Sequence, residues 1–164
     1  MNYVVTYLEM TAAEQLRPSS FPPEAIELRP ERDTFLIRSI HDRVAAPHHW
    51  SSLKWSDDHW RTQLARPDLH HWIAWVDDEP CGLLVLRTPT NGDYEIDTFG
   101  LVPEWVGRRF GGPFLTLAVR IAWDKGATRI WLHTSSLDHP NAIHNYERRG
   151  FRPFRPETRD GDDA

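Results

Sequence analysis

The chain has 164 residues, of which 40% are hydrophobic and 26% are charged, and its formal net charge at pH 7 is −5. This length fits one domain, and the composition is that of a globular chain and excludes a disordered one. The net negative charge argues against nucleic-acid binding, which requires a clustered basic face. The apolar runs are too short to span a membrane and no secretory signal peptide is recognisable, so we expect a cytoplasmic protein without membrane contact.

A first strand is predicted at residues 2–10, where β-branched and aromatic residues dominate. No partner strand is evident in the sequence that follows, so we interpret residues 1–24 as an N-terminal extension that carries an extra strand. A strand whose edge is unpaired often pairs with another chain. We therefore hypothesise a homodimer in which this strand completes the sheet of the neighbouring subunit.

A short strand at residues 25–30 is followed by two predicted helices. Apolar residues recur at helical spacing over residues 31–45, which indicates an amphipathic helix. Ser56 then precedes two aspartates, a pattern typical of a helix N-cap, and the second helix is expected to end near Ala65.

Three tryptophans, Trp50, Trp55 and Trp60, lie in or near the second of these helices. They either pack in the core or form an aromatic wall that attracts a cation in a substrate pocket. Both alternatives stay open, and Trp55 is kept as a candidate substrate contact.

Three further strands are predicted at residues 70–77, 81–88 and 94–102, and they are expected to form an antiparallel meander. The Asn91-Gly92 pair predicts a hairpin, because both residues accept the positive φ that a tight turn requires. Cys81, the single cysteine, is interpreted as a small buried strand residue.

The C-terminal part of the chain predicts a helix, a strand, a helix and a strand in that order. The pattern indicates a long amphipathic helix at residues 112–125 and a strand at residues 128–134. A short helix is expected from near Asp138 to Gly150, and a final strand begins directly after it. Residues 155–164 are expected to form a frayed tail.

The sequence VGRRFGG at residues 106–112 joins a predicted strand to a predicted helix. The first backbone N–H groups of a helix have no partner within it, and the helix dipole adds partial positive charge there. Glycines allow a phosphate group to approach this backbone closely. With Arg108 and Arg109 among them, these glycines predict a site for a pyrophosphate group.

Residues 94–154 resemble the GNAT superfamily of acyl-CoA-dependent N-acyltransferases. In that superfamily a strand leads through a V-x-P-like turn into a loop of the form [RQ]-x-x-G-x-[GA], and a later helix carries a tyrosine shortly before Gly-Phe. The segments LVPEWVGRRFGG and NYERRGF match this order, and WLHTSSLDHPNAIHNYERRGF resembles an uncharacterised bacterial subgroup. The loop departs from the pattern at Val106, where the superfamily has Arg or Gln, and at Arg109, where it has glycine.

The resemblance implies an α/β (α+β) fold: a single domain with a mixed, mostly antiparallel sheet of about six to seven strands flanked by about four helices. Residues 94–154 form the acetyl-CoA-binding core in this interpretation. The strand backbone pairs with the pantetheine arm, and the loop amides hold the pyrophosphate. The implied binding residues for acetyl-CoA are Phe99, Gly100, Leu101, Val102, Gly107, Arg108, Arg109, Phe110, Gly111, Gly112, Asn141 and Tyr146.

The implied reaction is direct transfer of an acetyl group from acetyl-CoA, the co-substrate, to an amine, and it requires no metal. Amine attack on a thioester needs a group that accepts the amine proton. Glu95 and Asp97 lie two residues apart on one strand and are expected to share a face. The resemblance places Glu95 at the position of the base and Tyr146 at that of the acid that protonates the departing thiolate. The alternatives are that Glu95 is a solvent-facing strand residue and that Tyr146 is a core aromatic residue. Asp97 is either an acceptor contact or a solvent-facing residue.

Several other polar residues have two interpretations. His133, at the end of a predicted strand, is either an acceptor contact that relays a proton or a structural histidine. Asn141 either binds pantetheine or caps a helix. The neighbouring pairs His48-His49 and His70-His71 do not predict a metal site, because adjacent residues of a strand point to opposite faces.

Two functional hypotheses follow from the sequence. The first is an acetyl-CoA-dependent N-acetyltransferase that acts on a small-molecule or peptide amine, and the second is a non-catalytic acyl-CoA sensor or complex subunit. Glu95 together with Tyr146 favours the enzyme, because a pure binding protein needs neither. The net acidity and the tryptophans favour a cationic amine as the acceptor.

Overall fold

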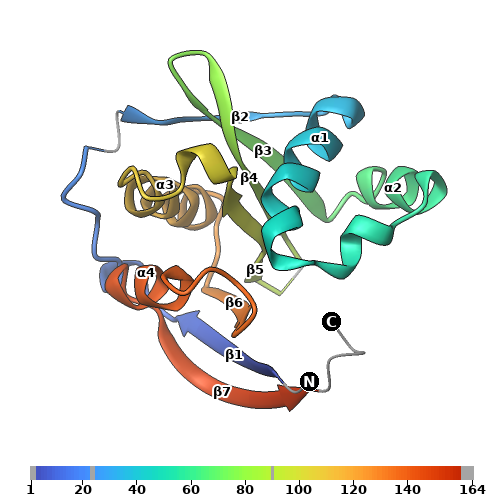
Figure 1. Cartoon of the computed structure of the whole chain (residues 1–164). Helices are drawn as coiled ribbons and strands as arrows, with labels where there is room; N and C mark the ends of the chain where they lie inside the picture. The colour runs from blue at the N-terminus through green and yellow to red at the C-terminus, as the bar shows by residue number, and fades with distance from the viewer. Residues whose placement is uncertain (1–2, 23–24, 90, 160–164) are drawn as a thin grey trace.

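A single sheet of seven strands organises the computed structural model, which describes residues 3–22, 25–89 and 91–159 (Figure 1). The strands are β1 (Tyr3–Met10), β2 (Glu27–Pro30), β3 (Leu69–Val76), β4 (Glu79–Arg87), β5 (Asp93–Leu101), β6 (Arg129–Ser135) and β7 (Arg152–Arg159). The α-helices are α1 (Thr34–Ala45), α2 (Asp57–Leu64), α3 (Gly111–Asp124) and α4 (Ala142–Arg148).

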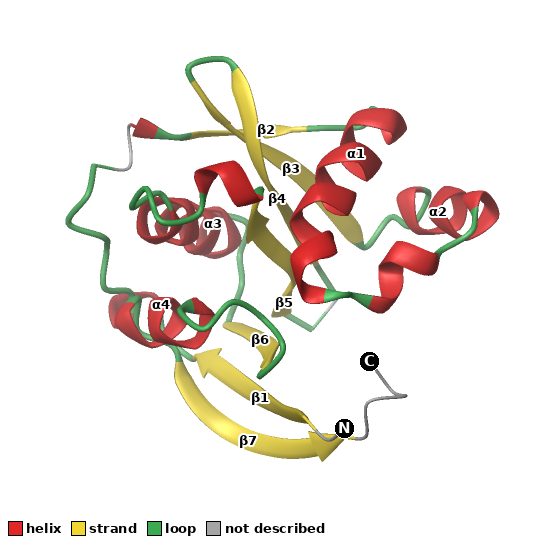
Figure 2. Ribbon diagram, viewed as in Figure 1, coloured by secondary structure: helices red, strands yellow, loops and turns green. Residues whose placement is uncertain are grey.

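The strand order is β2-β3-β4-β5-β6-β1-β7, and every neighbouring pair is antiparallel except β5 and β6, which are parallel. Helices α3 and α4 lie on one side of the sheet, and α1 and α2 lie on the other (Figure 2). The expected mixed, mostly antiparallel sheet with four flanking helices is therefore confirmed. None of the helices in the described ranges has both the length and the apolar character that crossing a bilayer requires.

The predicted meander of β3, β4 and β5 is confirmed by their antiparallel pairing. The tight turn in it joins β3 to β4, where Asp77 and Asp78 have positive φ angles of 50° and 64°, the geometry of a two-residue hairpin. The predicted Asn91-Gly92 turn lies in a longer connection, in which Gly92 has a φ of 84° and residue 90 lies outside the described residues.

Helix α1 packs on β4 and reaches β5 through one apolar face. Its N-cap is Asp33, whose side chain accepts a hydrogen bond of 3.1 Å from a backbone N–H of the first turn. Ile37, Ile40 and Val44 recur at helical spacing and are buried. A Cβ at Gly100 would lie 2.5 Å from Cγ1 of Val44, so the glycine is what allows α1 to approach the end of β5.

Helix α2 begins where the sequence predicts it. The side chain of Ser56 accepts a hydrogen bond from the backbone N–H of His59, and two aspartates occupy the first turn. Trp60 is the buried residue of this helix and joins the main core.

The interpretation of residues 1–24 as an extension is wrong, because β1 is an internal strand. It pairs antiparallel with β6, from Val5 opposite Ser135 to Met10, and with β7 on its other edge. Residue 2 of the predicted strand lies outside the described residues. Both partners come from the opposite end of the chain, so no local pattern of the sequence reveals them. The homodimer hypothesis assumed that β1 has an unpaired edge, and this assumption is wrong.

The prediction of a frayed tail from residue 155 is wrong for residues 155–159. These residues belong to β7 and pair with β1 as far as Tyr3 opposite Arg159. The prediction of a tail rested on the prolines and charged residues of this segment. An edge strand tolerates both, and β7 is an edge strand with exposed side chains at Phe154 and Arg155. Residues 160–164 lie outside the described residues.

Truncation of Leu8, which is fully buried in β1, to alanine is expected to lower the free energy of unfolding by about 2–5 kcal/mol. Val4→Ala on the same strand is the matched control, because Val4 is 42% exposed. That change should cost less than about 1 kcal/mol. Urea denaturation measures both, and a midpoint that rises with protein concentration would show that β1 pairs with a second chain instead.

Candidate functional site

The pairing of β5 with β6 ends early. Asp93–Glu95 pairs with Arg129–Trp131, and the described residues show no pairing between the two strands beyond that point. β5 nevertheless continues to Leu101 and β6 to Ser135, so the strands separate. The edge of β5 that faces the gap therefore offers backbone N–H and C=O groups to an extended ligand.

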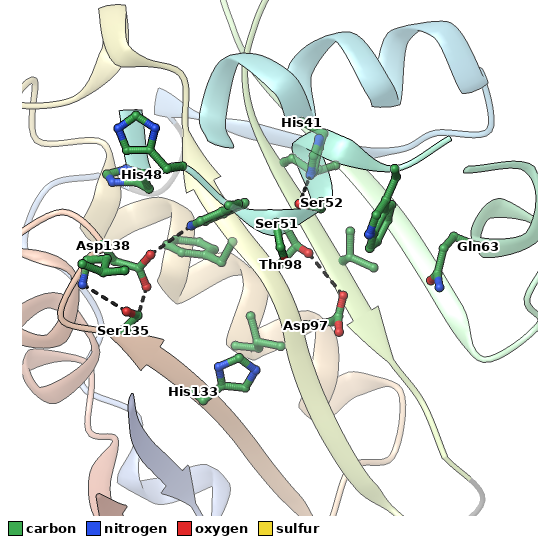
Figure 3. A pocket seen from close by; sticks show the side chains of 18 of the residues that line it. His41, His48, Ser51, Ser52, Gln63, Asp97, Thr98, His133, Ser135 and Asp138 are labelled. Atoms are coloured by element: carbon green, nitrogen blue, oxygen red, sulfur yellow. Dashed lines mark hydrogen bonds between the residues drawn. The ribbon is translucent and has the colours of Figure 1, made fainter. Parts of the chain in front are cut away.

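A cavity of about 360 Å³ lies where the strands separate. Its walls come from the sheet, from α1 and α2 with the segment between them, and from α4 with the loop before it. Figure 3 shows His133 projecting from β6 beside β5, which carries Asp97 and Thr98. Of the site residues predicted from the sequence, those that line the cavity are Trp55, Asp97, Phe99, His133 and Tyr146.

A bulge at Asp97 interrupts the regular alternation of β5. Val85 of β4 lies opposite Thr98, but Leu86 lies opposite Ile96, so Asp97 is the extra residue. The expectation that Glu95 and Asp97 share a face of β5 assumes a regular alternation of side chains, which this bulge interrupts. Asp97 lines the cavity, with its carboxylate 3.2 Å from the Thr98 hydroxyl that donates to it, whereas Glu95 is not among the lining residues.

Glu95 is a buried carboxyl group, 4% exposed, at the last position of β5 that pairs with β6. It forms an ion pair with Arg87 on β4, and its Oε2 lies 4.0 Å from Nε2 of His133. Burial, and then the negative charge of Asp97, raises the pKa of Glu95 to about 7, while Arg87 acts in the opposite direction. Such a group can accept and release a proton near neutral pH, and His133 connects it with the cavity.

Tyr146 places a phenol in the cavity wall from α4. Its ring centroid lies 6.1 Å from that of Phe99, which in turn lies 4.3 Å from that of Phe114 in α3. Burial, and to a smaller extent the charge of Asp138, raises the pKa of Tyr146. The hydroxyl therefore keeps its proton and is available as a donor.

The wall opposite the sheet is aromatic. The ring of His41 lies 4.7 Å from Trp60, 6.1 Å from Trp55 and 6.2 Å from Trp50, measured between centroids. Trp60 is buried in the core, while Trp50 and Trp55 are only partly buried and contact it, and all three line the cavity. The tryptophans therefore pack in or against the core, and they also present aromatic surface to the cavity.

His41 itself is held by two short polar contacts. Its Nδ1 lies 2.9 Å from Oδ1 of Asp42, and its Nε2 lies 2.7 Å from Oγ of Ser52. Burial lowers the pKa of His41, against the opposing effect of Asp42. The imidazole is therefore neutral near pH 7 and fixes the segment that follows α1 over the cavity.

Asp138 joins the two sides of the cavity. Its Oδ1 accepts a hydrogen bond of 3.0 Å from Nε1 of Trp50, and its Oδ2 accepts from the hydroxyl of Thr134 and the backbone N–H of Ser135, both at 2.9 Å. These contacts hold the chain in a turn at the end of β6. For this reason α4 begins at Ala142 and not near Asp138, where the sequence predicted its start.

The glycine-rich loop leads from β5 into α3 at the end where the strands separate. Gly107 has a φ of 83° and Arg109 a φ of 72°, so Arg109 adopts the left-handed backbone conformation that favours glycine. Phe110, the N-cap residue, provides no side-chain hydrogen bond, so the N–H groups of Gly111 and Gly112 begin α3 without a side-chain cap.

The two loop arginines lie on aromatic rings. Cζ of Arg108 is 4.8 Å from the ring centroid of Trp105, and Cζ of Arg109 is 5.6 Å from that of Phe21. Phe110 packs edge-on against both rings, so the loop is built around an aromatic cluster. The paired positive charges therefore stay exposed beside the start of α3.

Gly112 and Asn141 also have local roles. A Cβ at Gly112 would lie 2.5 Å from Nη1 of Arg149 and 2.6 Å from Oγ of Ser19, so a larger residue there would displace these two side chains. Asn141 precedes α4, but its side chain makes no capping hydrogen bond. Its backbone N–H instead donates to Nδ1 of His139 at 3.1 Å.

Sequence reasoning missed Arg87, Asp138 and His41. Arg87 lies opposite Glu95 only once the β4–β5 register is known, and the sequence offers no sign of it. Asp138 carried a usable signal, because an aspartate that ends a strand often bonds to a nearby backbone N–H. His41 is buried on the face of α1 that the apolar pattern assigns to the core.

No group of three or more His, Cys, Asp or Glu side chains suited to a metal ion occurs within the ranges that the structure describes. The two histidines of β3 point in different directions. Nε2 of His70 lies 3.0 Å from the hydroxyl of Thr88, whereas His71 lines the cavity.

Comparison with known proteins identifies a family. Residues 27–151 match the model of the acetyltransferase (GNAT) family. Mycothiol acetyltransferase of Corynebacterium aurimucosum is 33% identical over 81 residues, which are 49% of this chain and 23% of that protein.

Two solved structures share the fold. A GCN5-related N-acetyltransferase from Sphaerobacter thermophilus aligns with a TM-score of 0.68 and 19% identity over 94% of this chain and 49% of that one. An aminoglycoside acetyltransferase from an uncultured soil metagenomic sample aligns with a TM-score of 0.62 and 12% identity over 76% of this chain and 86% of that one. The chain thus spans about a quarter of the curated relative and about half of the Sphaerobacter protein.

The buried Glu95 should make stability depend on pH. Its pKa is raised to about 7 in the folded state, so its ionisation costs stability as the pH rises through that value. Glu95→Gln removes this penalty. The free energy of unfolding of the variant, relative to that of wild type, should therefore be higher at pH 8 than at pH 5 by on the order of 2 kcal/mol. Urea denaturation at both values measures the difference, and a constant difference would contradict the raised pKa.

Proposed function

The chain belongs to the acetyltransferase (GNAT) family, and from this premise we propose that it transfers an acetyl group from acetyl-CoA directly to a primary amine. The observation that carries the proposal is the separation of β5 from β6 beyond Glu95, because the resulting cavity has a carboxyl group beneath it and a phenol in its wall. Acyl transfer from a thioester to an amine needs one proton acceptor and one proton donor, and these two side chains supply them.

The proposed path of acetyl-CoA follows β5 into the loop and the start of α3. The backbone of Phe99, Gly100 and Leu101 lies on the strand whose edge is left open by β6, and Val102 follows that strand directly. The uncapped amides of Gly111 and Gly112, with the exposed Arg108 and Arg109, suit the two negative charges of a pyrophosphate. Asn141 and Tyr146, at the start of α4 and within it, would contact the arm that crosses the gap.

In the proposed reaction Glu95 is the base, and His133 conducts the proton to it. The neutral amine nitrogen attacks the thioester carbonyl carbon, a C–N bond forms, and the nitrogen loses one proton. His133 lines the cavity and its Nε2 lies 4.0 Å from the Glu95 carboxylate, so the proton can pass from the cavity to the buried carboxyl group. The ion pair with Arg87 holds that carboxylate in place.

Tyr146 is the proposed acid. When the C–S bond breaks, the electron pair leaves on sulfur, and the phenol gives this thiolate a proton. Burial keeps the hydroxyl protonated until that step, because a phenolate would be poorly solvated in the cavity wall. The proton held by Glu95 returns to solvent, and the phenol is reprotonated, so that the products are an amide and free CoA thiol.

The alternative is an acyl-CoA sensor that binds the co-substrate without turnover. A sensor needs the loop and the open edge of β5 but has no use for a carboxyl group with a pKa near neutrality beneath the cavity. The position of Glu95 next to a histidine that lines the cavity therefore favours the enzyme.

Glu95→Gln and Tyr146→Phe should each lower kcat by about 100-fold or more while the affinity for acetyl-CoA is retained. Turnover is measured by CoA release with the best amine found for wild type, and affinity is measured by isothermal titration. Glu79→Gln and Tyr94→Phe are the matched controls, because Glu79 is exposed next to the β3–β4 turn and the Tyr94 hydroxyl bonds to the backbone of Lys125.

Unchanged turnover in both test variants would remove the catalytic roles of Glu95 and Tyr146. Loss of acetyl-CoA binding in both, with normal urea denaturation, would assign the two side chains to co-substrate binding instead. The controls should retain both turnover and affinity.

A further inference from the structure

The cavity has an unbalanced set of charged side chains. Its described lining residues include two carboxylates, Asp97 and Asp138, but neither a lysine nor an arginine. Two arginines outside the lining already have carboxylate partners. Arg87 pairs with Glu95, and Arg66 binds Asp68 through two nitrogens at 2.7 and 3.0 Å, while its charge also interacts with that of Asp97. A carboxylate on a bound acceptor would therefore find no permanent cation in the cavity.

Two of the histidines that line the cavity, His41 and His71, do not replace that cation. Burial lowers the pKa of both His41 and His71, so these two imidazoles are neutral at pH 8. Both nitrogens of His41 are in addition occupied by Asp42 and Ser52. Neither residue supplies positive charge to an anionic group of a ligand.

The two carboxylates of the cavity differ in what they can still bind. Both oxygens of Asp138 already accept hydrogen bonds from Trp50, Thr134 and Ser135. Asp97 is exposed and lines the cavity, and one of its oxygens accepts a hydrogen bond from the Thr98 hydroxyl. It is therefore the carboxylate that would meet a positively charged acceptor, and it would repel a negatively charged one.

The remaining surface of the cavity suits a cation with an apolar body. Trp50 and Trp55 present aromatic surface to it, and tryptophan rings attract ammonium and guanidinium groups. The volume, about 360 Å³, is at the lower end of the range for small-molecule sites.

These observations, together with the proposed acetyl transfer on which the inference rests, identify a class of acceptor. We propose that the acceptor is a small cationic amine that carries no carboxylate, such as a diamine or a guanidino-alkylamine, and that Asp97 and the tryptophan wall bind its second positive group. An α-amino acid of the same shape is excluded because its carboxylate would lose water without gaining a cation.

Two pairs of acceptors that differ by the α-carboxylate alone test this proposal: cadaverine against lysine, and agmatine against arginine. At pH 8, kcat/KM for each carboxylate-free member should exceed that of its amino acid by roughly 100-fold or more, since an unpaired buried charge costs several kcal/mol. Equal values, or a preference for the amino acid, would overturn the acceptor class and leave the acetyltransferase activity in place.

If none of the four compounds is acetylated, the proposed function is in question. The proposed acceptor class is then tested by the binding of agmatine and arginine to the protein. Thermal denaturation with saturating CoA should show stabilisation by agmatine and none by arginine. Stabilisation by arginine equal to that by agmatine would overturn the proposal, whatever the turnover.

A charge introduced into the cavity provides a second test. Ser51 lines the cavity from the short helix η4 (Ser51–Lys54), and it is exposed, so it tolerates a longer side chain (Figure 3). Ser51→Arg should reduce the preference for agmatine over arginine by about tenfold, while Ser51→Gln, which also extends a polar side chain but is neutral, should keep it. Loss of the preference in both variants, or in neither, would contradict the charge argument.

Discussion

The early end of the pairing between β5 and β6 is the constraint on which the rest of the site depends. In a continuous sheet the side chains of these strands would pack against each other, and the backbone edge of β5 would be used by β6. Here the pairing stops at Glu95 opposite Trp131. The gap leaves a cavity between the strands and an open backbone edge, and it leads to the loop that begins α3. One interruption in a hydrogen-bonded ladder thus creates the space in which we propose that both substrates bind.

The charges of the site follow from the same interruption. Glu95 is the last residue of β5 that pairs with β6, and its burial there raises its pKa. Asp97 lies in a bulge beyond that point and lines the cavity. The two carboxyl groups, two residues apart, consequently have different tasks in the proposed function: one exchanges a proton and the other attracts a cation. The bulge matters for this division, because with regular alternation both groups would lie on one face with similar surroundings.

The local patterns of the sequence predicted the elements well, and the long-range pairings poorly. Ser56 as an N-cap, the meander and the helix after Gly111 follow from spacing and turn chemistry, which act between near neighbours. The place of β1 between β6 and β7 does not, because its partners lie at the other end of the chain. For the same reason the sequence pointed to Glu95, Asp97, His133 and Tyr146, but neither to Arg87, whose role depends on strand register, nor to the bulge that separates the two carboxyl groups.

The central claim is that the gap between β5 and β6 is a site of acetyl transfer to an amine. The most direct measurement is mass spectrometry of the acceptors, together with CoA release, after incubation with acetyl-CoA and a panel of polyamines, amino acids, aminoglycosides and peptides. The account predicts acetylation of one class of amine with an equal amount of CoA thiol. Stabilisation of the protein by acetyl-CoA without acetylation of any amine would contradict it and would identify a sensor.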